Sequence, residues 1–137
     1  MALTTSECDK IVDCAKETGK LLMVGHICRF DTRYAIAKRN IDDGKIGRIV
    51  SVYARRNIPA SVSESVLDKI SPISGDMIHD IDLMLWFTGE KIKSVYSNTL
   101  SVRNLPNPDI GWAMFKFESG AIGVCESVWF LPEKTPY

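Results

Sequence analysis

Titratable side chains gather in one short stretch of the sequence, Gly75 to Asp82, which reads GDMIHDID. Asp76 and His79 are three residues apart, and so are His79 and Asp82, so both pairs share a face if the stretch is helical. A carboxylate beside an imidazole fixes its tautomer and raises its basicity, as a general base working near neutral pH requires. The stretch therefore predicts an acid–base catalyst at His79.

Helix capping and metal binding are the alternatives for this stretch. The first turn of a helix is often enriched in Asp because the helix dipole favours negative charge there. The adjacent pair His79 and Asp80 is also typical of helical metal-dependent phosphohydrolases. Such sites need more histidines, however, and the sequence contains only one other, His26. We therefore expect no metal ion here.

A second candidate group, His26 and Arg29, follows the apolar run Leu21 to Val24. Side chains just beyond the carboxyl end of a parallel strand line the ligand crevice of open α/β sheets. Both residues are therefore candidates for substrate binding. The alternative is a hydrogen-bonded histidine at a domain junction and a surface arginine.

The residues before His26 have the pattern of a helix followed by a buried strand. Thr4 and Glu7 match a capping box, and apolar residues then recur at helical spacing until Gly19. The run at 21–24 is apolar without alternation, as in a strand buried on both faces. Such a helix and strand belong to a parallel α/β sheet, whose other strands would lie upstream of this chain.

The residues after His26 predict a different architecture, an α+β domain. Asp31 can cap a helix that ends near Gly44, and alternation predicts a strand over 49–56. We predict an irregular loop over 57–75, a helix over 76–87, and strands over 92–102, 110–117 and 121–130. Because a tight hairpin joins the last two strands, we expect an open, mainly antiparallel sheet with helices on one face.

The composition argues against several classes of function. Lys plus Arg and Asp plus Glu both number 17, so a net charge of zero gives no pull toward nucleic acid or an anionic membrane. The apolar runs are too short to span a bilayer, and the first residues do not resemble a signal peptide. None of the four cysteines forms a C-x-x-C pair, which predicts free, buried thiols in a cytoplasmic protein. No glycine-rich phosphate loop occurs, so we expect no cofactor-binding residue in this chain.

The order of these motifs resembles one enzyme family, the glucose–fructose oxidoreductase, inositol dehydrogenase and rhizopine catabolism protein family. The matching segments are Val24–His26, Arg29–Asp31, Gly44–Gly47 and His79–Asp82, with Trp86 and Gly89 after them. Members have an N-terminal Rossmann domain that binds NAD or NADP, followed by a domain with an open, mainly antiparallel sheet. They oxidise or reduce sugars, cyclitols and related alcohols.

The resemblance assigns roles to the candidate residues. His79 matches the catalytic histidine, which would take the hydroxyl proton as hydride leaves for the nicotinamide. Asp76 is the catalytic partner, although members place this aspartate four residues before the histidine and here it lies three before. One residue turns a helical side chain by about 100°. His26, Arg29 and Asp82 are the candidate substrate-binding residues.

The resemblance also implies a domain division and a missing part. Residues 1–24 would be a Rossmann remnant, and residues 25–137 a substrate and oligomerisation domain that is truncated at its C-terminus. The family's Glu-Lys-Pro motif, with its catalytic lysine, would precede Met1. We therefore expect a chain inactive alone, a sugar or cyclitol substrate, and a homo-oligomer. The alternative is a non-catalytic interaction module built on the same sheet.

Overall fold

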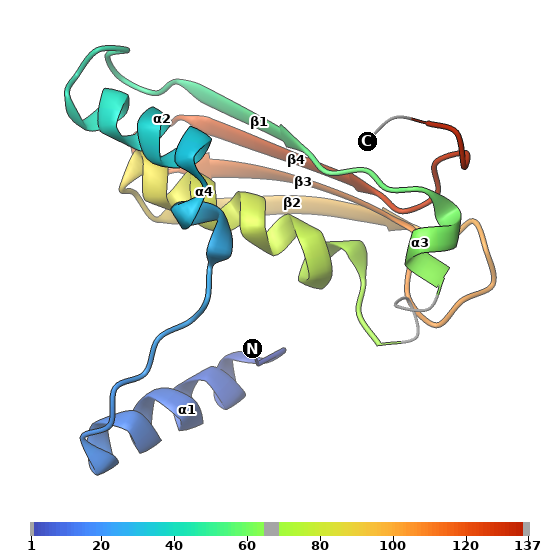
Figure 1. Cartoon of the computed structure of the whole chain (residues 1–137), viewed down its shortest axis with the longest axis horizontal. Helices are drawn as coiled ribbons and strands as arrows, with labels where there is room; N and C mark the ends of the chain where they lie inside the picture. The colour runs from blue at the N-terminus through green and yellow to red at the C-terminus, as the bar shows by residue number, and fades with distance from the viewer. Residues whose placement is uncertain (1, 65–68, 136–137) are drawn as a thin grey trace.

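The computed structural model describes residues 2–64 and 69–135. The helices are α1 (Thr5–Thr18), α2 (Thr32–Asp42), α3 (Ala60–Glu64) and α4 (Ile78–Thr88), with a 3-10 segment η1 (Ile27–Phe30) and a π segment η2 (Ile73–Met77). The strands are β1 (Ser51–Arg55), β2 (Ile92–Leu100), β3 (Ile110–Phe117) and β4 (Ile122–Val128). Figure 1 shows one sheet with α2 and α4 on the same side, and α1 set apart from it. No helix in the described ranges has the length and apolar character needed to cross a membrane.

The N-terminal helix is confirmed, whereas the strand predicted after it is wrong. Thr4 accepts a hydrogen bond from the Glu7 amide and the Glu7 carboxylate accepts one from the Thr4 amide, so the predicted capping box is present. Gly19 ends α1 with a left-handed φ of 63°. Residues 21–24 form none of the described strands, and Leu21 is 97% exposed. A strand needs a neighbour to pair its backbone groups, and the four strands pair only with one another.

The sheet is mainly antiparallel, as predicted, in the order β1-β4-β3-β2. β3 pairs antiparallel with both β2 and β4, while β1 joins β4 in parallel. Gly120 makes the tight turn between β3 and β4 with a φ of 91°, which a residue with a Cβ rarely adopts. The register places Tyr96, Met114, Val124 and Tyr53 in one row across all four strands.

One face of the sheet packs on helices and the other stays open. Met84 of α4 is buried with Phe115, Phe117 and Cys125 on the covered face, which forms the core of the domain. Gly123 lets α4 approach β4 closely, because a Cβ there would lie 2.9 Å from the Met84 sulfur. The predicted α+β fold, with helices on one face of the sheet, is confirmed.

The cysteines are free, as predicted, but their predicted burial is wrong for two of them. Cys8 and Cys14 are exposed on α1, which has no buried residue. Their helix has no covering sheet in the described part of the chain. Cys125 is buried in the core, and this burial raises the pKa of its thiol to about 12. The Cys125 thiol is therefore protonated at neutral pH and unreactive.

The irregular loop predicted over 57–75 is wrong in part. It contains α3 and the start of η2, and residues 65–68 lie outside the described residues. Arg103, beyond β2, holds α3 by donating to the Ala60 carbonyl at 3.1 Å and to the Ser63 hydroxyl at 3.0 Å. A partner forty residues away leaves no local signal, so the sequence pattern could not show this helix.

Candidate active site

Three aspartates at or just before the start of α4, Asp76, Asp80 and Asp82, each bind a different partner. Asp76 lies in the π segment η2, whose winding differs from that of α4, and it accepts a 2.7 Å hydrogen bond from Trp129 Nε1. Asp80 and Asp82 lie in α4 itself and each pairs with an arginine. In the described part of the chain no hydrogen bond joins His79 to these carboxylates. The shared face predicted for Asp76 and His79 therefore does not lead to a carboxylate–imidazole contact.

His79 is half-buried, and its Nδ1 is not engaged by any residue that the structure describes. Its Nδ1 is a buried atom that makes no hydrogen bond to a described residue, and the same holds for His26 Nδ1. Buried polar atoms are nearly always paired, so such an atom indicates a catalytic role, a ligand contact or an ordered water. Both histidines singled out from the sequence therefore keep a nitrogen available for a further partner.

The three predicted substrate-binding residues do come together. Arg29 of η1 donates two hydrogen bonds to Asp82, from Nε at 2.7 Å and from Nη2 at 2.6 Å. His26 Nε2 lies 3.6 Å from the same carboxylate. The Asp82 hydrogen bonds raise the pKa of Arg29, and its guanidinium lies over the Trp86 ring at 5.6 Å. This arrangement holds the arginine in one orientation, half-exposed beside the histidine.

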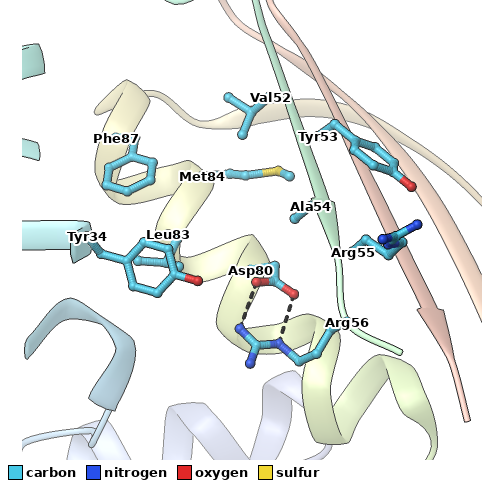
Figure 2. Close-up of a pocket in the computed structure, with 10 residues that line it drawn as sticks. All are labelled: Tyr34, Val52, Tyr53, Ala54, Arg55, Arg56, Asp80, Leu83, Met84 and Phe87. Atoms are coloured by element: carbon cyan, nitrogen blue, oxygen red, sulfur yellow. Dashed lines mark hydrogen bonds and ion pairs between the residues drawn. The ribbon is translucent and has the colours of Figure 1, made fainter. Parts of the chain in front are cut away.

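A second buried ion pair was missed by the sequence analysis. Arg56, just after β1, donates to Asp80 from Nε at 3.1 Å and from Nη2 at 2.9 Å, and Figure 2 shows both bonds. The Asp80 side chain is only 9% exposed, and its hydrogen bonds raise the pKa of Arg56. Cys28 Sγ lies 3.9 Å from Arg56 Nη2. Arg56 and Asp80 are 24 positions apart in the sequence, and the packing of α4 against β1 brings them together.

Two cavities meet at the end of β1. One, of about 330 Å³, lies between β1, α2 and α4 and has Asp80 and Arg56 in its wall. Figure 2 shows Tyr53 and Arg55 on the side of β1 away from α4. The other, of about 480 Å³, is lined by Arg55, Arg56 and Asp76 among others. Its carboxylate and guanidinium groups suit a ligand rich in hydroxyl groups.

A metal ion has no prepared site in this region. No group of three or more His, Cys, Asp or Glu side chains in residues 2–64 and 69–135 is arranged to hold one. Asp80 and Asp82 are bound by arginines instead. The region contains histidine and aspartate side chains that can exchange protons and arginine side chains that can donate hydrogen bonds. Groups of these kinds can bind and deprotonate an alcohol.

Comparison with known families decides the relationship of the chain. A family model, GFO/IDH/MocA C-terminal domain, matches residues 34–136. The chain belongs to this family. The match confirms the resemblance drawn from the motifs, and it runs from α2 past the end of β4. Asp76, His79, Asp80 and Asp82 all lie inside the GFO/IDH/MocA match. His26 and Arg29 lie before it.

Named relatives of this GFO/IDH/MocA domain are inositol dehydrogenases. Inositol 2-dehydrogenase 2 of Saccharopolyspora erythraea is 33% identical over 113 residues, 80% of this chain and 32% of that protein. The scyllo-inositol 2-dehydrogenase (NAD(+)) of Bacillus subtilis is 33% identical and covers 93% of this chain and 39% of its own length. The crystal structure of apo scyllo-inositol dehydrogenase from Lactobacillus casei superimposes with a TM-score of 0.82 at 25% identity, covering 96% of this chain and 41% of that one. The chain thus spans about two-fifths or less of these relatives.

Proposed function

We propose that this chain is the substrate-side domain of an NAD(P)-dependent oxidoreductase acting on a sugar, a cyclitol or a related alcohol. Membership of the GFO/IDH/MocA family and the inositol dehydrogenases among its relatives support the reaction class. The observation that carries the proposal is the unpaired, buried ring nitrogen of His79. Residues 1–24 are then the end of a dinucleotide-binding domain and residues 25–137 the substrate domain, inside a larger cytoplasmic enzyme that is inactive without its other parts.

In this proposal the α4 region handles the substrate alcohol. His79 is the general base that receives the proton of the hydroxyl group being oxidised. Asp76, in the wall of the cavity of about 480 Å³, accepts a hydrogen bond from the substrate and orients that hydroxyl toward the base. Arg29 and His26 donate to further hydroxyl oxygens, while Asp82 holds both in place.

The N-termini of α1 and α2 do not fit the phosphates of a dinucleotide. Phosphates bind where helix N-termini present free backbone amides. At α1 the amides of Leu3 and Thr4 bond to the Glu7 carboxylate, and these bonds lower its pKa, so negative charge occupies the helix start. At α2, hydrogen bonds from Arg33 lower the pKa of Asp31 to about 2, with the same result. In this proposal other parts of the enzyme therefore hold the cofactor.

The first prediction separates the isolated chain from the complete enzyme. We expect no appreciable heat when NAD⁺, NADH or NADP⁺ is titrated into the 137-residue chain in a calorimeter, because acidic groups occupy the N-termini of α1 and α2. The complete enzyme, mixed with NAD⁺ or NADP⁺ and a set of polyols including scyllo-inositol, should reduce the nicotinamide. Micromolar binding to the isolated chain contradicts the first expectation, and a complete enzyme that oxidises no polyol contradicts the proposed function.

The open face of the sheet favours a second candidate function, a non-catalytic interaction module that forms a homo-oligomer. Large apolar side chains lie together there: Tyr53 is 58% exposed, Tyr96 70%, Trp112 44% and Met114 51%. A contiguous apolar patch of this kind marks an interaction surface. Self-association of this face is compatible with both the oxidoreductase domain and the interaction module. Oligomerisation of a complete protein that binds no polyol would favour the interaction module.

The second prediction concerns this open face. We expect a homodimer or higher oligomer by light scattering, because the row that contains Met114 crosses all four strands without cover. Met114→Glu should give monomers, since it places a charge in the middle of the apolar face. Lys10→Glu, a charge change on exposed α1, should leave the association unchanged. A wild-type chain that stays monomeric at high concentration would exclude this surface as the interface.

A further inference from the structure

Trp129 contacts Asp76, which lies 53 positions before it in the sequence. It follows β4 directly, is 3% exposed, and donates from Nε1 to Asp76 Oδ2 at 2.7 Å. Hydrogen bonds from N–H groups to carboxylates are short and strong. In the described part of the chain no hydrogen bond engages the other carboxylate oxygen, Oδ1. One oxygen of Asp76 is thus fixed by the indole while the residue borders the cavity of about 480 Å³.

The backbone of Trp129 is itself held by three neighbours. Its amide donates to the Asp109 carbonyl at 2.8 Å. Its carbonyl accepts from the Ser63 hydroxyl and from Arg103 Nη2, both at 2.8 Å. The main chain that carries the indole is therefore held by α3 and by the segment between β2 and β3.

Gly75 gives the indole ring its place beneath Asp76. A Cβ at Gly75 would lie 2.7 Å from Cη2 of the Trp129 ring and 2.9 Å from Ile70 Cδ1. Real Cβ atoms do not approach ring atoms so closely, so an added methyl group would displace the ring. The glycine and the π segment together bring the Asp76 carboxylate onto the indole N–H.

We infer that Trp129 is a positioning residue, which acts through Asp76 by fixing one carboxylate oxygen and leaving the other for the substrate. The inference rests on the proposed role of Asp76. A carboxylate that must orient a hydroxyl group needs one fixed rotamer, and a displacement of about 1 Å can cost a hundredfold in rate. Here the hydrogen bond from Trp129, a contact between distant parts of the chain, holds that rotamer.

The hydrogen bond is tested on the chain itself by nuclear magnetic resonance. The three tryptophans, Trp86, Trp112 and Trp129, should give three indole N–H signals, assigned by Trp129→Phe and Trp112→Phe. We expect Asp76→Ala to shift the Trp129 signal and speed its exchange with water, while the Trp112 signal stays unchanged. If Trp129→Phe does not fold, Gly75→Ala should displace the same signal. An indole signal that is insensitive to both Asp76→Ala and Gly75→Ala overturns the inference.

The consequence for catalysis is tested in the complete enzyme. We expect Trp129→Phe, which keeps the ring and removes the donor, to lower kcat by about ten- to a hundredfold with KM nearly unchanged. Lys10→Glu, on exposed α1, should be close to wild type. Normal kcat in Trp129→Phe beside impaired kcat in Asp76→Ala overturns the inference alone. Normal kcat in Asp76→Ala also overturns the inference, because Trp129 would then position a group that catalysis does not need. Normal kcat in His79→Ala contradicts the proposed function instead.

Discussion

His79→Ala lowers the turnover of the complete enzyme by about two to four orders of magnitude, the usual effect of removing a general base. The expectation follows from the buried Nδ1 of His79 at the start of α4, which has no hydrogen-bond partner among the described residues. The loss should lie mainly in kcat, measured as nicotinamide reduction under saturating polyol. Folding stability should change little, because the imidazole makes no hydrogen bond to a residue that the structure describes.

Two matched variants make the His79 result specific. His26→Ala removes the other histidine, which lies 3.6 Å from Asp82, and should chiefly raise KM because it weakens a substrate contact. Asp76→Ala should cost less turnover than His79→Ala, because the carboxylate orients the hydroxyl group but does not take its proton. Near-normal turnover in His79→Ala would end the assignment of the base and leave the interaction module as the better function.

Arg103→Ala destabilises the fold by about 3–5 kcal/mol, the typical cost of leaving a buried charge without its partner. Asp109 has 0% exposure and accepts from the Val102 amide at 2.7 Å, the Arg103 amide at 2.9 Å and Arg103 Nε at 2.6 Å. The substitution also removes one hydrogen bond to each of the carbonyls of Ala60 and Trp129, which keep their bonds from the Ser63 hydroxyl. Urea unfolding of the 137-residue chain at neutral pH measures the change.

An exposed ion pair is the control for the Arg103 result. Arg33, with an 84% exposed side chain, pairs with Asp31, so Arg33→Ala should change the free energy of unfolding very little, because solvent screens an exposed ion pair. A change of that small size in Arg103→Ala as well would show that the Asp109 pair contributes little to the stability of the fold.

The pH dependence of stability gives a second readout for the Arg103 pair. Burial raises the pKa of Asp109, but hydrogen bonds from the amides of Arg103 and Val102 and from the guanidinium outweigh it and hold the pKa below its ordinary value. A lowered folded-state pKa means that the stabilisation is present at neutral pH and is lost as the pH falls through that value. In Arg103→Ala the free energy of unfolding should therefore fall less steeply in acid.

Local patterns in the sequence were enough to predict most elements and the fold class. The capping box at Thr4, the left-handed Gly19 and the Gly120 hairpin each depend on contacts within a few residues, so their signals are complete in the sequence. Alternation along β1 and β3 separated the covered face from the open one. The stretch Gly75 to Asp82 also singled out His79 as the candidate base, because several titratable residues gather there at the start of a helix.

Tertiary structure decided which partners these residues have. Arg29 and Asp82 are 53 positions apart, and Trp129 and Asp76 are separated by the same number. Such pairs form only when α4 packs against η1 and η2 packs against the end of β4, and no local spacing encodes that packing. For the same reason the apolar run at 21–24 could not be a strand by itself. Periodicity specifies the hydrogen bonds a segment makes within itself, whereas the partner of a buried charge or of a strand edge is set by the rest of the fold.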